Sequence, residues 1–571
     1  MKSVFQFLIL FSIIIYYLSN CASISPPGGG PRDTIPPVLI ESTPENKSLN
    51  FSGTSVKLTY DEYLKVENLT KQLIITPILK DEYDFKIKKN SVELIFKEPF
   101  ADTTTYTFNF QEAIKDITES NVTLDNVLAF STGDYIDSLH ITGKVLDLFT
   151  EKPVKESLIC LYKINDTLDI FNSPPVYLTK SNNEGKFIIE NIKNGRYKIY
   201  AYKDANSNLM CDIPKEMFGF KRDSIELNSN LDSIVMKIQY LNMQELFVQR
   251  DGPTGNYYEV KTNKPIVSYN VSPLNDYDTL YNNFGEDKKT IRFYNNIGFN
   301  DSIPFILTAT DSLDQFLQDT LYMKFRETKR EKEFFTISFS PKNNSKIEEH
   351  FDGAFKFNKP VKKIIYDSIY FEYDSVTFQH INDSLFIATK NTNDNIEFEI
   401  ELFMSDYIES LKKLDTANST KADPANRQKA DSKSNTKQNT KFILHLHVKK
   451  GAFISVENDS TDAFVNKYEQ LRSDNYGIIK GKVASEHSSY TIQLLNTKFE
   501  VVSEIKDEKS YIFNNVDPGQ YKIRVLVDNN GNGKWDPGNI FNNIEPEDIY
   551  FFQDNLSIRS NWELTDIDLS F

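Results

Sequence analysis

The sequence predicts an all-β protein made of tandem β-sandwiches, and three observations lead to this fold class. Tyr and Phe are abundant, with 30 and 42 residues in a chain of 571. Val, Ile and Thr recur in short alternating runs that Asn, Asp, Gly and Pro interrupt, a pattern typical of strands and turns. The chain is long enough for several domains, and its 3 cysteines are too few for a disulfide-dense scaffold.

The chain begins with a targeting segment. Lys2 precedes the apolar run from Val4 to Leu18, which is too short to span a bilayer of ~30 Å but suits a secretory signal peptide over residues 1–20. The end of this segment, up to Cys21, resembles a bacterial lipoprotein signal, which implies that Cys21 is lipidated. Ordinary cleavage nearby is the alternative. Residues 21–35 are rich in Gly and Pro and predict a tether.

Residues 36–133 predict the first sandwich. Apolar and polar residues alternate at 56–60, 92–96 and 106–110, so each run buries one face of a strand, and the spacing suits about seven strands. Four motifs stand out: Pro36-Pro37-Val38, Thr43-Pro44-Glu45-Asn46, Leu58-Thr59-Tyr60-Asp61-Glu62 and Phe130-Ser131-Thr132-Gly133. Through them the region resembles the bacterial Ig-like domain of S-layer proteins, and the resemblance implies a spacer or interaction module.

A segment that occurs twice predicts a repeated domain. Gly195-Arg196-Tyr197 leads through an alternating run to Asp204, and Gly519-Gln520-Tyr521 leads in the same way to Asp528. Each copy also has an earlier glycine-containing strand and an Asn-rich turn. These features resemble the small β-sandwich of carboxypeptidase regulatory domains, relatives of which occur in Gram-positive surface adhesins. The two regions are residues 138–238 and 476–571.

Two further regions separate the repeats. Strand-like runs in residues 239–330 predict a β-rich domain of unassigned type. Residues 331–475 echo the first region and predict a second Ig-like domain. Inside it, residues 415–441 contain no aromatic residue and no apolar periodicity, so we expect a disordered insertion. The whole layout resembles the Ig-like-domain lipoproteins of Bacteroidetes bacteria, which implies lipid anchoring at the outer membrane of the cell envelope. Whether the protein faces the periplasm or the surface stays open.

The oxygen-rich loop of each repeat has the spacing of a calcium loop. Calcium prefers hard oxygen ligands, and a tight loop presents side chains 1, 3, 5 and 9 with the carbonyl of position 7. In the second copy these are Asp528, Asn530, Asn532, Asp536 and the Lys534 carbonyl. In the first copy they are Asp204, Asn206, Asn208, Asp212 and the Met210 carbonyl.

The two copies differ at the sharp turn of the loop. Gly533 takes this position in the second copy, whereas Leu209 takes it in the first, so the first loop is the weaker candidate. Glu216 and Glu545 are candidates for a further carboxylate. Two carboxylates and two amides predict weak binding, with a dissociation constant of about 10⁻⁴ to 10⁻³ M. The alternative is an Asx-rich turn without metal.

Other candidate sites are weaker. Cys160 and Cys211 fall in one predicted domain and could pair in an oxidising compartment. His445-Leu446-His447 places two imidazoles on one face of a strand, which could bind zinc, but no carboxylate is near in sequence and a solvated face is the stronger interpretation. The chain contains no nucleophile elbow, zinc-protease motif or phosphate-binding glycine loop.

The composition narrows the function. The net charge of −16 argues against nucleic acid as a partner. We expect a non-enzymatic lipoprotein of the cell envelope, held at the membrane by its lipid, with structural or interaction roles. Its partner would be an envelope protein or a polysaccharide. The alternative function is binding of a glycan or another surface polymer, and an enzyme is the least favoured class.

Overall fold

The computed structural model describes most of the chain after the N-terminal segment. It covers residues 32–571 except 80–81, 165–169, 214, 275–279, 296–301, 348–349, 374–377, 383–385, 389–396, 404–442 and 472. The predicted signal peptide, Cys21, most of the tether and the insertion at 415–441 lie outside the described residues. The chain divides into two compact units, Met1–Tyr240 and Leu241–Phe571.

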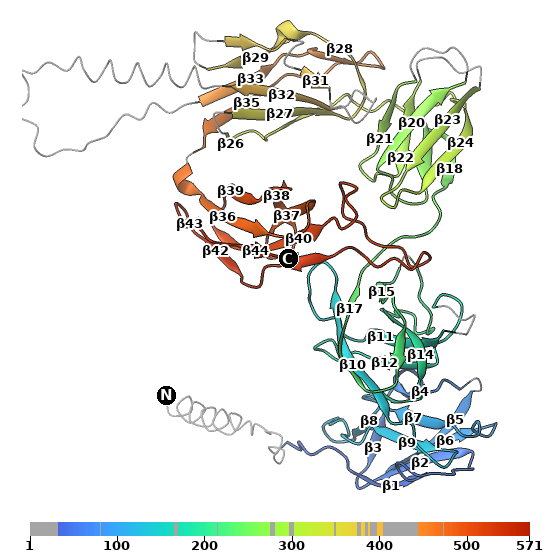
Figure 1. The fold of residues 1–571 in the computed structure, drawn as a ribbon. Coiled ribbons are helices and arrows are strands. Elements are labelled where there is room, and N and C mark those ends of the chain that lie inside the picture. The colour runs from blue at the N-terminus through green and yellow to red at the C-terminus, as the bar shows by residue number, and fades with distance from the viewer. Residues whose placement is uncertain are drawn as a thin grey trace, which may run out of the picture. The chain divides into compact units, whose positions relative to one another are not determined.

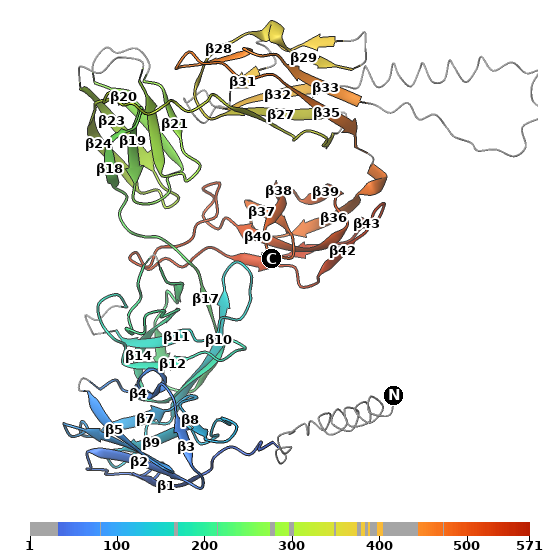
Figure 2. The ribbon, with the colours of Figure 1, turned by 180° about the vertical axis from the view of Figure 1, so that it is seen from behind.

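The all-β prediction is confirmed, because the described residues form β-sandwiches that appear as separate groups of strands in Figure 1 and, from behind, in Figure 2. Helical turns are short, and within the described part of the chain none reaches the length and apolar character of a membrane span. Among the described residues, the helical elements are α2 (Leu69–Gln72), η1 (Tyr366–Ser368) and η4 (Ser473–Asn475).

The first sandwich begins the first unit. Its sheets have the orders β1-β2-β6-β5 and β4-β7-β9, with β3 paired to β8. The inward residues of the three runs predicted from alternation all join one core, which confirms those strands, although the region contains more strands than expected. The strands are β1 (Leu39–Thr43), β2 (Ser55–Tyr60), β3 (Leu64–Val66), β4 (Ile74–Thr76), β5 (Tyr83–Lys88), β6 (Ser91–Phe96), β7 (Thr105–Asn109), β8 (Ile114–Asp116) and β9 (Val127–Ser131).

The second sandwich completes the first unit. One sheet has the order β13-β10-β17, with β10 and β17 parallel, and the other has the order β12-β11-β14-β15, with β16 also on β14. The strands are β10 (Leu139–Asp147), β11 (Leu158–Lys163), β12 (Tyr177–Lys180), β13 (Lys186–Ile192), β14 (Gly195–Tyr202), β15 (Phe218–Phe220), β16 (Ile225–Leu227) and β17 (Leu231–Ile238).

The fifth sandwich, at the end of the chain, has the same topology. Its sheets are β39-β36-β43, with β44 also parallel to β36, and β38-β37-β40-β41, with β42 on β40. The repeat seen in the sequence is therefore also a repeat of structure. The strands are β36 (Gly477–Ala484), β37 (Tyr490–Leu495), β38 (Val501–Lys506), β39 (Ser510–Val516), β40 (Gly519–Val527), β41 (Ile549–Phe551), β42 (Leu556–Ile558), β43 (Glu563–Leu564) and β44 (Leu569–Ser570).

The third sandwich opens the second unit and packs two sheets, β18-β19-β22-β21 and β20-β23-β24. Strand β23 alternates buried and half-buried residues along its whole length, as expected of a strand with one face in a core. The strands are β18 (Val248–Thr254), β19 (Tyr257–Thr262), β20 (Ser268–Pro273), β21 (Asn282–Phe284), β22 (Thr290–Tyr294), β23 (Ile303–Thr310) and β24 (Phe316–Met323).

The fourth sandwich has sheets of order β25-β27-β32-β31 and β26-β35-β33-β29-β30, with a β28-β34 pair. Its core is rich in Phe. The strands are β25 (Ile337–Ser340), β26 (Lys346–Ile347), β27 (His350–Phe357), β28 (Val361–Ile364), β29 (Ile369–Glu372), β30 (Phe378–His380), β31 (Phe386–Ala388), β32 (Glu397–Phe403), β33 (Ile443–Val448), β34 (Phe453–Ser455) and β35 (Phe464–Gln470).

Candidate functional site

The loop that follows β40 is organised by the carboxylate of Asp528, which is only 6% exposed. One of its oxygens accepts hydrogen bonds from the backbone N–H groups of Gly531 (2.7 Å) and Asn532 (3.1 Å), and the other accepts one from Gly533 (2.8 Å). Burial acts to raise the pKa of Asp528, but these N–H groups, together with a side-chain hydrogen bond from Ser489, outweigh it and lower the pKa below its ordinary value. Asp528 is therefore a charged carboxylate at neutral pH.

The two amides of this loop converge on Asp536. The side-chain oxygens of Asn530 and Asn532 accept the N–H groups of Asn532 and Lys534, each at 3.0 Å. Their Nδ2 groups donate to Asp536 Oδ2, at 2.6 Å from Asn530 and 2.7 Å from Asn532. The structure thus brings together the four side chains that the sequence selects in this loop. The Lys534 ammonium also lies 3.8 Å from Asp536 Oδ1.

A buried glutamate also stabilises the backbone of the same loop. Glu547 is 9% exposed, and its carboxylate accepts the N–H groups of Asn530 (3.0 Å) and Asp536 (2.8 Å). The backbone oxygen of Glu547 also accepts the indole N–H of Trp535 at 3.0 Å. Glu545, which the sequence suggests as a further carboxylate for this loop, stays a prediction, since the contacts at this place belong to Glu547. Both oxygens of Glu547 face backbone donors, so this side chain shapes the loop.

The first copy of the loop repeats the arrangement around Asp204. Its carboxylate accepts the N–H groups of Asn208 (3.2 Å) and Leu209 (3.0 Å). Asn206 Oδ1 accepts Asn208 N–H at 3.0 Å, and Asn208 Oδ1 accepts Met210 N–H at 2.9 Å. Leu209 adopts a left-handed φ of +60°, which costs an L-residue about 1–2 kcal/mol. This backbone strain is a physical reason to expect weaker metal binding by the first loop than by the second.

The remaining residues of the first loop also match the second. The Nδ2 groups of Asn206 and Asn208 donate to Asp212 Oδ2, the latter at 3.4 Å. Glu216 is 2% exposed, and its carboxylate accepts the N–H groups of Ala205 (2.7 Å) and Asp212 (3.0 Å). The sequence selects Glu216 in the first copy but not Glu547 in the second, because the position of this glutamate is set by the strand that follows the loop. Glu216 lies just before β15, as Glu547 lies just before β41.

The donor set of both loops has the chemistry that calcium requires, namely carboxylate, amide and carbonyl oxygens. Two features of the second loop still separate it from a formed calcium site. The Nδ2 groups of Asn530 and Asn532 face Asp536, so each amide has to turn over before its oxygen can reach a shared cation. The carboxylate of Asp528 already accepts three backbone N–H groups and a side-chain hydrogen bond from Ser489, so a cation has to share its oxygens with these donors.

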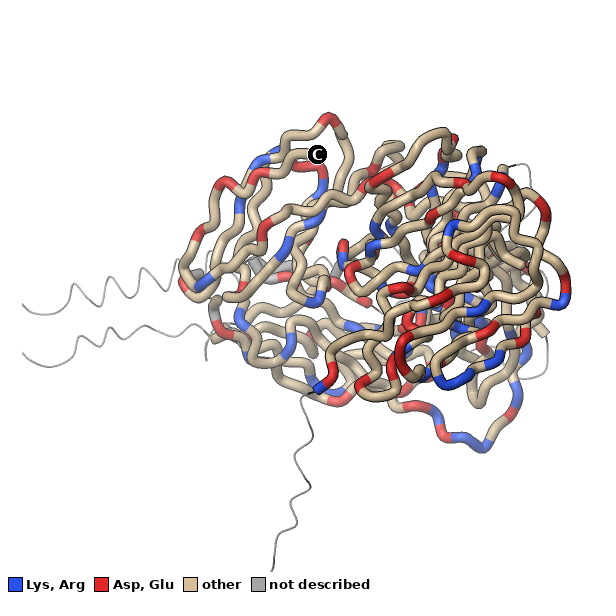
Figure 3. The backbone as a smooth tube through the Cα atoms, turned by 90° about the horizontal axis from the view of Figure 1, so that it is seen from below, with Lys and Arg blue, Asp and Glu red and all other residues tan. Residues whose placement is uncertain are grey.

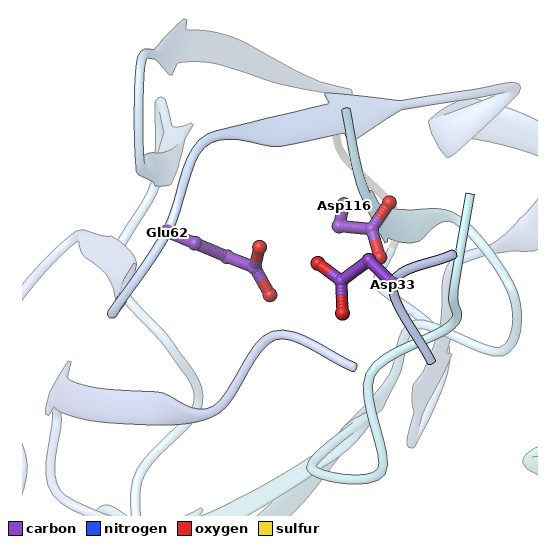
Figure 4. Close-up of side chains that lie close together, drawn as sticks. All are labelled: Asp33, Glu62 and Asp116. Carbon is purple, nitrogen blue, oxygen red and sulfur yellow. The ribbon is translucent and has the colours of Figure 1, made fainter. Parts of the chain in front are cut away.

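The structure also brings together carboxylates that the sequence analysis did not select. Oxygens of Asp33, Glu62 and Asp116 all lie within 4.8 Å of one another, and Figure 4 shows the three side chains close together. Pairing of β3 with β8 places Leu64 opposite Asp116 and so carries Glu62 towards it. Long-range pairing of this kind leaves no local sequence signal.

The three carboxylates have different environments. Asp116 is fully buried and accepts N–H groups from residues 119–121, among them Glu119 at 2.7 Å and Ser120 at 2.8 Å. Burial acts to raise its pKa, but these bonds lower it. Glu62 has a raised pKa, because of its burial and of the negative charges of Asp116, Asp61 and Asp33. The arrangement can hold a proton on Glu62 or attract a cation.

The two buried cysteines of the second sandwich are free thiols, so the disulfide that the sequence left open is not formed. Burial raises the pKa of Cys160 to about 12 and also raises that of Cys211. Neither thiol is therefore activated as a nucleophile. Charges of both signs are interspersed along the described backbone, as Figure 3 shows. The lipidation residue Cys21 lies outside the described residues.

Comparison with known proteins supports the fold of the first sandwich. The family model described as a bacterial Ig-like domain matches residues 33–132, which confirms the Ig-like prediction for this region. No curated protein matches the chain in sequence.

Similar solved structures include the major pilin subunit BcpA of Bacillus cereus, with 9% identity, a TM-score of 0.13 and coverage of 76% of this chain and 99% of that chain. Surface layer protein SbsC, domains 1–6, has 8% identity, a TM-score of 0.14 and coverage of 92% and 68%. SGBP-B of the Bacteroides ovatus mixed-linkage glucan utilization locus, in complex with a mixed-linkage heptasaccharide, has 8% identity, a TM-score of 0.15 and coverage of 67% and 85%. Scores this low carry no argument about function.

Proposed function

We propose that the protein is a non-enzymatic lipoprotein of the cell envelope, in which a lipid on Cys21 anchors an array of β-sandwich modules to the outer membrane. The observation that supports this proposal is the succession of sandwiches, each with its own apolar core. An array of separately folded modules suits spacing and interaction, as in other modular β-proteins. Its partners would be the membrane, through the lipid, and an envelope protein or polysaccharide.

The anchoring is tested by comparing wild type with Cys21→Ser in intact cells. Wild type should fractionate with the outer membrane, and Cys21→Ser should lose this association. External protease, with a periplasmic protein as the protected control, then gives the orientation. Membrane association that survives Cys21→Ser would contradict a lipid anchor.

The proposal includes weak calcium binding by the loops, stronger in the second because Gly531 and Gly533 adopt its left-handed positions without side-chain strain. At 10 mM calcium and a dissociation constant of about 10⁻⁴–10⁻³ M, the fifth sandwich should gain about 1.4–2.7 kcal/mol. Urea unfolding followed by Trp fluorescence measures this gain. Asp536→Asn should reduce it, and an unchanged midpoint in wild type would exclude the calcium site.

A second candidate function is glycan binding. It is favoured by a groove of ≈ 610 Å³ in the first unit. Carboxamide and charged side chains line this groove, and both kinds can pair with sugar hydroxyls. The polar lining residues are Gln72, Asn109, Gln111, Glu112, Thr123, Asn126, Glu156, Thr179, Lys180, Ser181, Asn182, Asn183 and Lys186.

Electrophoresis of the purified protein in gels that contain envelope polysaccharide tests this candidate. A bound polymer should retard wild type, and Gln72→Ala combined with Asn183→Ala should restore free mobility. If no polysaccharide retards the protein, or if the double variant is retarded equally, the groove is not a glycan site.

A further inference from the structure

The outward face of one sheet of the fourth sandwich gathers three of the 6 histidines of the chain. His445 and His447 lie on β33 and His380 lies on β30, with β29 between these strands. The pairing places Glu372 of β29 opposite His445, and Tyr370 opposite both His447 and His380. The sheet therefore supplies the carboxylate that is missing near His445 and His447 in the sequence.

Glu372 already contacts one of the two histidines of β33. His447 Nε2 lies 2.5 Å from Glu372 Oε2, and the two side chains are 22% and 27% exposed. The rings of His445 and His447 have centroids 6.1 Å apart. Directly opposite residues of an antiparallel pair have Cβ atoms about 4.5–5.5 Å apart, so His445 and Glu372 start from neighbouring positions. Solvent reaches this cluster, and an ion can enter it.

The residue types and their placement fit zinc. Zinc takes imidazole nitrogen and carboxylate oxygen, and sites with three protein ligands leave the fourth position to water. Ligand atoms that share a tetrahedral zinc at about 2.0–2.1 Å lie roughly 3.3 Å apart. The contact between His447 and Glu372 therefore needs to open by less than about 1 Å. The ligand atoms of the three residues do not yet lie within 4.8 Å of one another, so His445 has to rotate towards the ion.

An aromatic ring holds one of the three side chains in place, and the positive charge of a nearby lysine is partly compensated. Tyr370 stacks on His447, with ring centroids 4.8 Å apart and an angle of 7°, which fixes the plane of the imidazole. Lys449 lies over the other ring of this stack, 5.4 Å from the centroid of Tyr370. Lys467 faces His445 from β35, and its ammonium lies 3.5 Å from Glu469. Its positive charge is partly compensated there.

We propose that Glu372, His445 and His447 bind one Zn²⁺ ion and that water completes the coordination. The ion would link β29 to β33 across the surface of the sheet. This site is independent of the lipid anchor and of the two calcium loops. It adds a divalent transition metal to the ligands of the protein.

The test is a zinc titration of the purified full-length protein in competition with a chromophoric chelator. Wild type should bind one Zn²⁺ per chain at this site. His445→Ala combined with His447→Ala should abolish that binding, and Glu372→Gln should weaken it by about tenfold or more. His380→Ala is the matched control, because this histidine lies on the same face of the sheet but beyond Tyr370. The His380→Ala variant should bind zinc as wild type does.

A second readout does not depend on the variants. Co²⁺ in place of zinc should give wild type the intense visible absorption of a four-coordinate site, and the double histidine variant should lack it. Circular dichroism checks that each variant is folded. Absence of stoichiometric zinc binding would overturn the proposal, and so would binding that persists in the double variant or a weak, six-coordinate Co²⁺ spectrum in wild type.

Discussion

Gly533 and Gly538 both adopt left-handed backbone in the loop after β40, with φ of +87° and +77°. A Cβ at Gly533 would meet nothing within 4 Å, whereas one at Gly538 would lie 2.6 Å from the Ile544 carbonyl oxygen. We expect Gly533→Ala to lower the free energy of unfolding by about 1 kcal/mol, from backbone strain alone. Gly538→Ala should cost about 2–4 kcal/mol, because a clash with backbone adds to the strain.

Tryptophan fluorescence can follow the unfolding of the fifth sandwich in these two variants. The chain has 2 tryptophans, Trp535 and Trp562, and both belong to the fifth sandwich. Urea unfolding followed by Trp fluorescence therefore reports this sandwich alone, and a chelator in the buffer removes any effect of calcium. Equal losses in the two variants would contradict the difference in their surroundings.

The charge state of Glu62 predicts how the stability of the first sandwich depends on pH. Its pKa is raised in the folded protein by burial and by neighbouring carboxylates, so the folded state holds the proton more tightly than the unfolded state. The ionised group therefore destabilises the fold above its pKa, and the effect disappears below about pH 4, where both states are protonated.

Glu62→Gln should therefore raise the unfolding temperature at pH 7 and leave it unchanged at pH 3. Thermal unfolding followed by circular dichroism at the two pH values checks this result. The exposed Glu98 provides the control, because Glu98→Gln should have little effect at either pH. Destabilisation by Glu62→Gln at pH 7 would show that an ionised Glu62 contributes favourably.

At the scale of elements, a tyrosine anchors the same strand in both copies of the repeat. The hydroxyl of Tyr197, near the start of β14, donates to the Lys193 carbonyl at 2.7 Å, and that of Tyr521, near the start of β40, donates to the Asp517 carbonyl at 2.8 Å. A tyrosine that bonds back to the chain just upstream fixes the corner of a sandwich.

Each Tyr→Phe substitution should cost about 1 kcal/mol, because it removes the donor and leaves a carbonyl without this partner. Tyr521→Phe should shift the Trp-detected unfolding midpoint. Tyr197→Phe should shift only a transition seen by circular dichroism. A Trp-detected shift for Tyr197→Phe would mean that the second and fifth sandwiches unfold together.

Elements that depend on local alternation could be predicted from the sequence, and contacts that depend on strand pairing could not. The alternation of apolar and polar residues at 56–60 predicted strand β2, because alternation is a property of neighbouring residues in the sequence. The loop from Asp528 to Asp536 was found for the same reason. Glu547 was missed because its distance from Asp528 includes a long loop. Glu372 was missed as a partner of His445 because β29 and β33 are far apart in sequence.

At the scale of the whole molecule, separate cores suggest separate unfolding. Each of the five large apolar clusters in the described residues draws its members from one sandwich. A smaller cluster of Tyr257, Tyr294 and Val456 joins residues of the third and fourth sandwiches. We therefore expect coupling between the third and fourth sandwiches, and independent behaviour of the first and fifth sandwiches, which belong to different units.

This independence is tested with one core substitution in each of these two sandwiches of the full chain. Phe108 of the first and Ile523 of the fifth are both 0% exposed, so Phe108→Ala should cost about 3–5 kcal/mol and Ile523→Ala about 2–5 kcal/mol. Ile523→Ala should lower the Trp-detected midpoint. Phe108→Ala should leave that midpoint unchanged and lower a transition seen by calorimetry, because its loss of packing stays within the first core. If Phe108→Ala lowers the Trp-detected midpoint as well, the sandwiches form one cooperative unit, and the description of the protein as an array of independent modules is wrong.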